Sequence, residues 1–537
     1  MVELIVLLGE VDGVMDDLSI DIDLVKTSTI WELLEQRASL TPQASMLVDA
    51  SRNVRVTYSQ ARLIAERLAA GLQSQGIAPG SQVTWQLPTG LNAVMTALAL
   101  SRLGCIQNPV IHLYGEHELR SVLVGSGSDT LLVPGVYGGR DFLAEATRVC
   151  AEVAKAPRVL VLQGELPQGR PETLPPPPVD GKQVRWVYYT SGTTAAPKGA
   201  RHTDQTLMIS GRNLAQAMGV TAADVGTIAF PYAHIGGAMY TCMLLVSGMS
   251  AVLLERFQAA EAASVFRRFG VTTTGGSTAH YEALLAEQRR QPEKPLIPSL
   301  RLLCGGGAPK PPELYHAVRR EMACALTHNY GMTEVPLVSA GQPMDTDEQL
   351  ANSDGAPVDG VHVRVVGGDG QDVIAGSEGE VRLYGDGVFK GYTDTRLNAD
   401  AFDERGYFRT GDLGMLRSDG RLVLTGRLKD VIIRKGENIS AREIEDLLYT
   451  HPKVSNVAVI GLPDRLRGER VCAVIEATPE MPVLSFTEMQ DFFIAAGVMR
   501  QKIPEQLEVV AQLPRNQTLN KILKHELRAR FSNNQDA

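Results

Sequence analysis

The stretch Tyr189-Thr-Ser-Gly-Thr-Thr-Ala-Ala-Pro-Lys-Gly199 carries the strongest signal in this chain, because it places hydroxyl groups, glycines and one lysine in a single loop. Backbone N–H groups and hydroxyls in such a loop can donate to phosphate oxygens, and a lysine adds a point charge. A P-loop has a second glycine before its lysine and Ser or Thr after it, whereas this chain has Pro197 and Gly199 at those positions. The stretch therefore predicts a polyphosphate site of another kind, with a polar surface turn as the alternative.

Length, composition and charge restrict the class of protein. A chain of 537 residues exceeds what one hydrophobic core usually supports, so we expect two or more domains. With 44% hydrophobic and 21% charged residues, it has the composition of an ordinary soluble globular protein. Its net charge of −9 argues against nucleic acid as the main partner, although a local basic patch could still bind phosphates.

Cysteines and apolar runs bear on the compartment. The six cysteines are scattered without a C-x-x-C pair, which favours a reducing compartment without structural zinc, and we expect a cytoplasmic protein. The apolar run 4–8 is flanked by Glu3 and Glu10 and is too short for a signal peptide. No run approaches the roughly 20 apolar residues of a membrane span. Peripheral membrane contact and a homodimer are left open.

Helical and strand patterns alternate along most of the chain. A capping box, Thr57-x-x-Gln60, precedes a helical apolar spacing, residues 83–87 alternate like a strand, and 90–104 read as a helix. This alternation continues to about residue 340 and predicts doubly wound α/β layers. Four consecutive prolines at 175–178 favour a long loop inside one domain over a domain boundary.

The pattern of residue types changes twice in the C-terminal part of the chain. Residues 355–425 show short strands separated by Gly/Asp turns, which predicts a β-rich subdomain. After 426–430, a second capping-box pattern, Ser440-x-x-Glu443, opens a segment that reads as a small α+β domain. We therefore predict an α/β fold with an N-terminal domain at 1–428, in which 1–25 are an acidic lead-in, and a small mobile C-terminal domain at 429–537.

Six further segments follow the phosphate loop in a characteristic order. They are Pro231-Tyr-Ala-His-Ile-Gly-Gly237, Gly305-Gly-Gly-Ala-Pro309, Asn329-Tyr-Gly-Met-Thr-Glu334, Thr410-Gly-Asp-Leu413, Gly426-Arg-Leu-Lys-Asp430 and Pro514 through Lys521. Together with the loop they resemble the ordered motifs of the adenylate-forming superfamily, which contains acyl-CoA synthetases, peptide-synthetase adenylation domains and beetle luciferases. The resemblance runs from about residue 30 to the end of the chain.

The resemblance implies a two-step reaction and its cofactors. A carboxylate attacks the α-phosphate of ATP to give acyl-AMP and pyrophosphate, and a thiol then attacks the acyl-AMP. The first step brings a carboxylate against a polyanion, so the site needs cations and oriented donors. ATP, Mg²⁺ and coenzyme A are the expected cofactors, and the partners are a small-molecule carboxylic acid and CoA.

Each motif residue then receives an expected role. Glu334 has the oxygen ligand that Mg²⁺ prefers, Thr333 can donate to the α-phosphate, and the resemblance makes Lys521 the lysine that bridges acyl carboxylate and α-phosphate. The remaining nucleotide and thiol contacts are expected from Thr190, Ser191, Gly192, Thr193, Thr194 and Lys198 for phosphate; Gly307, Ala308, Pro309, Asn329, Tyr330, Gly331 and Met332 for adenine and its surroundings; Asp412 and Arg427 for ribose; Lys429 as the hinge; and Lys435 and Gly436 for the pantetheine arm.

Two positions differ from the family pattern, and segment 231–237 bears on which branch of the superfamily the chain resembles. Ala195 and Asn520 stand where most relatives have glycine; Asn tolerates a left-handed backbone better than most residues. Segment 231–237 lacks the aspartate that pairs with the amine of an amino-acid substrate, and the chain ends soon after Lys521. Both points favour a free acid and CoA, with His234 as a candidate gate of the acyl tunnel or a structural histidine.

The sequence favours one class of acid and leaves three alternative functions open. Small residues after His234 and the absence of an evident cation for a second carboxylate favour an aliphatic, alicyclic or sterol-derived acid. The alternatives are an acyl-AMP ligase that loads a carrier protein, a luciferase-like oxidase, and a non-catalytic acyl or nucleotide sensor. A CoA-dependent AMP-release assay distinguishes them.

Overall fold

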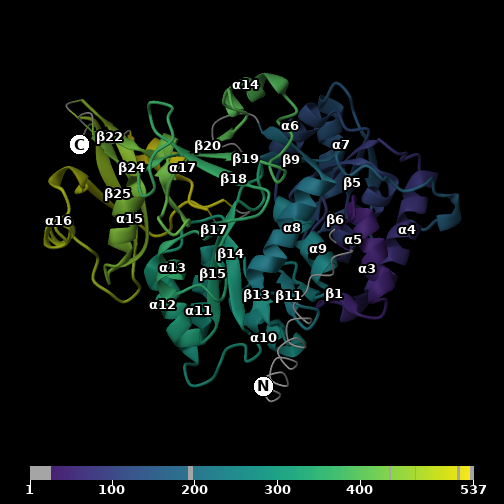
Figure 1. Ribbon diagram of the computed structural model, residues 1–537, viewed down its shortest axis with the longest axis horizontal. Coiled ribbons are helices and arrows are strands. Elements are labelled where there is room, and N and C mark those ends of the chain that lie inside the picture. The colour runs from purple at the N-terminus through teal and green to yellow at the C-terminus, as the bar shows by residue number, and fades with distance from the viewer. Residues whose placement is uncertain are drawn as a thin grey trace, which may run out of the picture.

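The structure is a computed structural model that describes residues 24, 26–190, 197–434, 437–465, 467–516 and 521–532. In Figure 1 the chain runs from helices at the right of the view to a small unit of strands and helices at the left. Three sheets that contain parallel strands come first, and an antiparallel sheet and a mostly antiparallel sheet follow toward the C-terminal end.

A six-stranded sheet has the order β10-β9-β4-β3-β5-β8, and only its edge strand β10 runs antiparallel. Its strands are β3 (Gln82–Trp85), β4 (Ile106–Pro109), β5 (Thr130–Val133), β8 (Arg158–Val161), β9 (Val184–Thr190) and β10 (Lys198–Thr203). The four prolines lie between β8 and β9, after the short helix η2 (Pro171–Thr173). Because both strands belong to one sheet, the proline-rich stretch is a loop within that unit, as predicted.

Two further sheets complete the α/β region. One has the order β11-β12-β1-β2 and the other β13-β14-β15-β16-β17. Their strands are β1 (Ser45–Asp49), β2 (Val54–Thr57), β11 (Val225–Ile228), β12 (Ser250–Leu253), β13 (Thr273–Thr274), β14 (Leu302–Gly306), β15 (Ala325–Tyr330), β16 (Ser339–Ala340) and β17 (Ala356–Pro357). A small hairpin stands apart, β6 (Val136–Tyr137) with β7 (Arg140–Asp141).

Helices cover these sheets and bury their apolar faces between the layers. They are α3 (Ile30–Leu40), α4 (Tyr58–Ser74), α5 (Leu91–Leu103), α6 (Glu116–Ser126), α7 (Phe142–Glu152), α8 (Asp204–Met218), α9 (Ile235–Ser247), α10 (Ala259–Phe269), α11 (Thr278–Arg290), α12 (Pro312–Met322) and α13 (Asp347–Asn352). The predicted capping box at Thr57 is present: its hydroxyl accepts from the Gln60 N–H, and the Gln60 side chain accepts from the Thr57 N–H. The helix predicted at 90–104 is α5.

The predicted β-rich segment is an antiparallel sheet of order β18-β19-β20-β21. Its strands are β18 (His362–Val366), β19 (Gly379–Tyr384), β20 (Phe408–Leu416) and β21 (Leu422–Arg427), and the short helices η3 (Thr395–Leu397) and α14 (Asn398–Ala401) lie between β19 and β20. From β21 the chain passes through η4 (Leu428–Asp430) into a different sheet. The predicted hinge therefore falls on the segment between two sheets.

The last sheet has the order β23-β22-β25-β24, with β26 paired in parallel to β25. Its elements are β22 (Ile432–Arg434), β23 (Glu437–Ile439), α15 (Ala441–Tyr449), β24 (Val454–Asp464), β25 (Gly468–Ala477), α16 (Phe486–Ala495), η5 (Arg500–Lys502), β26 (Gln506–Val510) and α17 (Lys524–Ser532). The basic helix predicted at 519–531 begins later, at Lys524. This unit forms the left-hand part of Figure 1.

The second predicted capping box is only half formed. The Ser440 hydroxyl accepts from the Glu443 N–H and so caps α15, as the pattern indicates. The Glu443 carboxylate instead accepts from Lys502 Nζ at 2.7 Å, on η5. A cation supplied by a distant part of the chain has replaced the local backbone partner.

Candidate active site

Parallel strands of the α/β region end next to one another at the candidate site. Residues 305–309 comprise the last two residues of β14 and the turn after it, and residues 331–334 follow β15. The strands β14 and β15 are neighbours in parallel register. An added Cβ at Gly306 would lie 2.0 Å from the Asn329 carbonyl oxygen, so the two strand ends touch through backbone. The carboxyl ends of parallel strands are where α/β sheets bind ligands.

Glu334 lies in this group, among partners that fix its carboxylate. The Tyr392 hydroxyl donates to Glu334 Oε1 at 2.6 Å. Burial raises the pKa of Glu334, while the Tyr392 hydrogen bond and the nearby charge of Lys198 act in the opposite direction. The Lys198 ammonium lies 5.3 Å from the centre of the Tyr392 ring, close enough for a cation–π contact. The metal-ligand candidate and the phosphate-loop lysine are therefore brought together.

A buried histidine positions Thr333. His202 Nε2 lies 2.7 Å from the Thr333 carbonyl oxygen, and its Nδ1 lies 3.0 Å from the Thr206 hydroxyl. Burial lowers the pKa of His202 to about 4, so the imidazole is neutral at pH 7. A carbonyl oxygen can only accept, so Nε2 carries the proton and Nδ1 accepts from Thr206. This neutral histidine links α8 to the loop that carries Thr333 and Glu334.

Asp412, Arg427 and Tyr330 form one connected group. Asp412 on β20 and Arg427 on β21 are register partners, and Arg427 Nε donates to Asp412 Oδ1 at 2.9 Å. The Tyr330 hydroxyl donates to Asp412 Oδ2 at 2.6 Å. Asp412 is buried, and each of its oxygens retains a second lone pair for a further donor. The predicted ribose residues and the predicted adenine tyrosine are thus adjacent.

Asn329 has a free acceptor at the end of β15. Its amide nitrogen donates to Cys304 Sγ at 3.3 Å, whereas its Oδ1 is buried and has no hydrogen-bond partner among the described residues. A buried acceptor without a partner is costly unless a ligand supplies the donor. The exocyclic amino group of adenine is such a donor.

The glycines around Asn329 allow close backbone packing. Gly307 has φ +82°, a left-handed value, and it lies on the exposed edge of the strand end with Pro309, while Ala308 is half-buried. An added Cβ at Gly331 would lie 2.2 Å from the Pro336 carbonyl oxygen. Met332, also half-buried, donates its N–H to the Val335 carbonyl at 2.9 Å. These residues form the surroundings that a flat base requires.

Lys521 reaches this group from the C-terminal unit. Burial and the charge of Arg427 lower the pKa of Lys521 to about 8, and Asp412 acts in the opposite direction. The Lys521 N–H donates to Asn516 Oδ1 at 2.9 Å, which fixes one end of its loop. Lys429, on η4, is exposed, and its charge also lowers the pKa of Lys521. The described arrangement therefore places the C-terminal lysine beside the nucleotide candidates.

His234 has a structural role in the described chain. It is the N-cap of α9, and its Nδ1 accepts from the Gly236 N–H at 3.2 Å. Burial lowers the pKa of His234 to about 4, so it is a neutral cap at pH 7. The gating role expected from the resemblance stays a prediction.

The phosphate loop is described only at its ends. Thr190 and Lys198 are register partners on the antiparallel strands β9 and β10, so the loop connects two strands. A P-loop instead leads from a strand into a helix, which agrees with the rejection of that motif. Ser191, Gly192, Thr193, Thr194, Lys435 and Gly436, together with Ala195 and Asn520, lie outside the described residues.

Several contributors to the site were missed by the sequence analysis. Tyr392, which orients Glu334, and His202, which holds Thr333, come from segments without a recognised motif. Cys304, the partner of Asn329, precedes the glycine run by one residue. Their only local signal is position: Tyr392 follows a glycine, and His202 follows the phosphate loop by a few residues.

Among the described residues, no group of three or more His, Cys, Asp or Glu side chains could hold a metal ion. All six cysteines are buried and free. In the same part of the chain, no helix is both long and apolar enough to span a bilayer.

Comparison with known proteins identifies the family. A model described as AMP-binding enzyme matches residues 34–393, more than half of the chain, and one described as AMP-binding enzyme C-terminal domain matches 443–519. The chain belongs to the AMP-binding enzyme family. The predicted membership in the adenylate-forming superfamily, in its acyl-CoA synthetase branch, is confirmed.

Individual relatives cover nearly the whole chain. It is 32% identical to a salicyl-AMP ligase / salicyl-S-ArCP synthetase of Mycobacterium tuberculosis, with 86% of this chain and 82% of that protein covered. It is 30% identical to the long-chain-fatty-acid–CoA ligase FadD13 of the same species, with 93% and 98% covered. The solved o-succinylbenzoate coenzyme A synthetase (MenE) of Bacillus subtilis, in complex with ATP and magnesium ion, is 28% identical with a TM-score of 0.79 over 92% of this chain and 98% of that one. These structural likenesses confirm the predicted α/β fold class.

Proposed function

We propose that this protein is an ATP-dependent acyl-CoA synthetase. It would convert a carboxylic acid and ATP to acyl-AMP and pyrophosphate, and then acyl-AMP and CoA to acyl-CoA and AMP. One observation carries the proposal: Lys521, from the C-terminal unit, lies within the charge environment of Asp412 and Arg427. A cation delivered there by a separate unit suits a reaction whose first step joins two anions.

The residues present fit a bound adenine nucleotide. Asn329 Oδ1 is a buried acceptor that lacks a partner among the described residues, and Asp412 retains acceptor capacity on both oxygens. Glu334 would hold Mg²⁺ as a single carboxylate, with phosphate oxygens and water completing the shell, which is how Mg²⁺ is usually bound with nucleotides. When bound, the ion would neutralise phosphate charge.

Two lysine side chains would act in the first step. Lys198 lies beside the Glu334–Tyr392 pair and would neutralise phosphate charge there. Lys521 would hold the acid carboxylate against the α-phosphate and stabilise the charge that develops as the acyl–phosphate bond forms. Removing one such oriented group typically costs about 10²–10³ in rate.

The second step requires a thiol, and we propose that the thiol is CoA. Lys429 lies on the connection between β21 and β22, where rotation would withdraw Lys521 and bring the loop at Lys435 and Gly436 to the acyl-AMP. The relatives include CoA ligases, and they also include a salicyl-AMP ligase whose name specifies a carrier protein. A carrier-loading ligase is therefore the second candidate.

The test is release of AMP and pyrophosphate with a panel of aliphatic, alicyclic and sterol-derived acids, with and without CoA. A CoA synthetase forms thioester and AMP only when CoA is present. A carrier ligase releases pyrophosphate with acid alone and forms no CoA thioester. Nucleotide binding without turnover on any acid would contradict both and would identify a sensor.

A further inference from the structure

One carboxylate of the α/β region meets two different parts of the C-terminal unit. Glu282, on α11, accepts a hydrogen bond from the hydroxyl of Tyr449, on α15. Burial raises the pKa of Glu282, and the charge of Arg515, which lies in the loop before Lys521, acts in the opposite direction. We propose that Glu282 is a positioning residue for the first half-reaction, because it binds the C-terminal unit in the arrangement that brings Lys521 to the nucleotide residues. This inference rests on the proposed function, which supplies the step that the contact serves.

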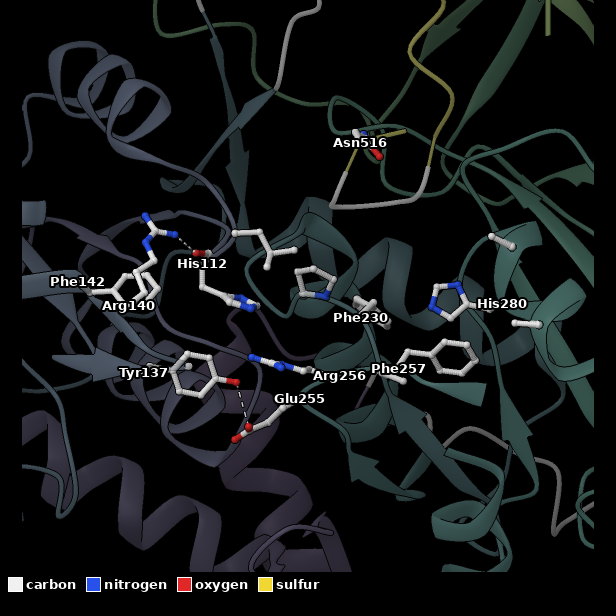
Figure 2. A pocket seen from close by; sticks show the side chains of 16 residues that line it. His112, Tyr137, Arg140, Phe142, Phe230, Glu255, Arg256, Phe257, His280 and Asn516 are labelled. Atoms are coloured by element: carbon white, nitrogen blue, oxygen red, sulfur yellow. Dashed lines mark hydrogen bonds between the residues drawn. The ribbon is translucent and has the colours of Figure 1, made fainter. Parts of the chain in front are cut away.

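The loop before Lys521 lies close to the start of α11. A cavity of about 560 Å³ is lined by His280 and Ala283 of α11 and also by Asn516 of the C-terminal unit. Figure 2 shows Asn516 above this cavity and His280 on one of its walls. Glu282 lies between His280 and Ala283 in the sequence. The two units therefore meet at the turn of α11 that carries Glu282.

Hydrogen bonds connect Arg515 to Lys521 within the C-terminal unit. Asn516, the neighbour of Arg515, donates its N–H to the Lys521 carbonyl at 2.8 Å, and its Oδ1 accepts from the Lys521 N–H at 2.9 Å. One residue further out on each side, Arg515 and Ile522 form a β-bridge. An interaction that restrains Arg515 therefore also restrains the backbone of Lys521.

The C-terminal unit also fixes Arg515 from its own side. Arg515 Nη2 donates to Asn456 Oδ1 at 2.9 Å, and the Asn456 amide nitrogen donates to Glu476 Oε2 at 2.9 Å. Burial and the charge of Glu476 raise the pKa of Glu282, whereas Tyr449 and Arg515 lower it. The two groups that stabilise the Glu282 anion thus both come from the C-terminal unit.

A neighbouring cation on α11 has its own partner. Arg289 Nε and Nη2 donate to the two carboxylate oxygens of Glu321 at 2.6 and 3.0 Å. This pair lies within the α/β region, on α11 and α12. The charge of Glu282 is therefore balanced across the boundary between the units, where its loss would weaken their contact.

The experiment measures the two half-reactions separately. Tyr449→Phe removes the donor and keeps the ring, and Glu282→Ala removes the carboxylate. Each should lower acid-dependent ATP–pyrophosphate exchange about 10- to 100-fold, the effect of a lost hydrogen bond to a charged group. Conversion of supplied acyl-AMP and CoA to acyl-CoA should stay unchanged in both variants, because Lys521 is withdrawn in that step.

Further variants test the contact itself. The double variant should lose no more exchange than Glu282→Ala alone, because Tyr449→Phe removes part of the same contact. Glu282→Gln keeps an acceptor for the Tyr449 hydroxyl and loses the charge that faces Arg515, so it should retain more exchange than Glu282→Ala. The control is Glu443→Gln on α15, whose carboxylate pairs with Lys502 of the same unit, and it should change neither half-reaction.

A distance measurement follows docking of the C-terminal unit without turnover. Nitroxide labels on Arg290→Cys, at the end of α11, and Asp491→Cys, on α16, are both at exposed positions, and the six native cysteines are buried. In the presence of ATP and Mg²⁺, Tyr449→Phe and Glu282→Ala should lower the fraction of molecules at the main wild-type distance.

The outcomes separate this inference from the proposed function. If no acid is turned over but both variants lower that fraction, the synthetase assignment fails and the positioning role of Glu282 stands. If the wild type carries out both half-reactions and the variants leave exchange unchanged, the positioning role fails and the synthetase assignment stands. Equal loss of both half-reactions in Glu282→Ala would also overturn the positioning role, since Glu282 would then serve the fold.

Discussion

The pKa of Lys521 predicts how the first half-reaction depends on pH. Burial and the charge of Arg427 hold this pKa at about 8, against an ordinary 10.5. Only the protonated ammonium can stabilise charge between a carboxylate and a phosphate. Activity is therefore present below the pKa and lost as pH rises through it.

The size of the effect follows from the same value. A group with a pKa of about 8 is about 90% protonated at pH 7 and about 10% protonated at pH 9. The kcat/KM for ATP, which reports the free enzyme, should fall about tenfold between those pH values. Lys521→Arg carries a cation whose pKa exceeds 12, so its profile should be flat over this range.

Acid-dependent ATP–pyrophosphate exchange from pH 6.5 to 9.5 measures this step without the thiol. Lys521→Ala should lose about 10²–10³ in exchange at every pH and yet convert supplied acyl-AMP and CoA to acyl-CoA. Loss of both half-reactions in Lys521→Ala would contradict the proposed rotation about Lys429.

Lys310 provides the matched control. Burial lowers its pKa to about 8 as well, and its Nζ donates to the Ala351 carbonyl at 2.8 Å. Lys310→Arg should keep the alkaline decline of the wild type. If instead the decline persists in Lys521→Arg and disappears in Lys310→Arg, the assignment of the titrating group to Lys521 is wrong.

Three further predictions concern the nucleotide side of the site. Asp412→Ala should weaken ATP use about a hundredfold in a folded protein, because a buried carboxylate with charged hydrogen bonds is lost; an unchanged KM for ATP would make Asp412 a turn residue only. Glu334→Gln should raise the Mg²⁺ concentration needed for half-maximal exchange at least tenfold. If the Mg²⁺ titration curves of the variant and the wild type coincide, the assignment of Glu334 as the Mg²⁺ ligand is wrong. Gly199→Ala should destabilise the fold by about 1–3 kcal/mol in denaturant melts, because its Cβ would lie 2.7 Å from Thr393 Oγ1 and 2.9 Å from the Tyr189 ring; a variant as stable as the wild type would show that this contact relaxes.

Local patterns predicted much of this structure because they depend on neighbours in the chain. The capping box at Thr57, the helix α5 and the strands β18 and β19 follow from side-chain periodicity and from residues a few positions apart. The site motifs were also readable, since each is a short continuous run of residues in the sequence. In each case the residues that carry the pattern lie within a few positions of the helix, strand or motif that they predict.

The same local patterns could not predict contacts between residues that are far apart in the sequence. Strand β1 pairs with β12, some two hundred residues later, and nothing local to either strand specifies the other. The Glu443 carboxylate binds Lys502 instead of its own helix end for the same reason. The cavity of about 560 Å³ was out of reach as well, because the hairpin β6–β7, the residues 255–257 and α11 that line it are far apart in the sequence.

The C-terminal unit has a core of its own, which supports a proposed boundary near Lys429. Its two apolar clusters contain residues from 432 onward and none from the α/β region. An element with a complete core can change its neighbours without exposing that core to water. In the described part of the chain, η4 is the covalent connection between the two units, and the proposed movement would occur about it.

Polar contacts hold this unit in the arrangement that places Lys521 at the site. The Tyr449 hydroxyl donates to Glu282 on α11, and the Ser440 hydroxyl donates to the Thr425 carbonyl at 2.8 Å. Burial raises the pKa of Glu282, so this contact is made at some electrostatic cost. Interfaces of this polar kind exchange their partners for water more readily than apolar ones do. Contacts of this kind would therefore also allow Lys521 to leave the site, as the proposed rotation between the two half-reactions requires.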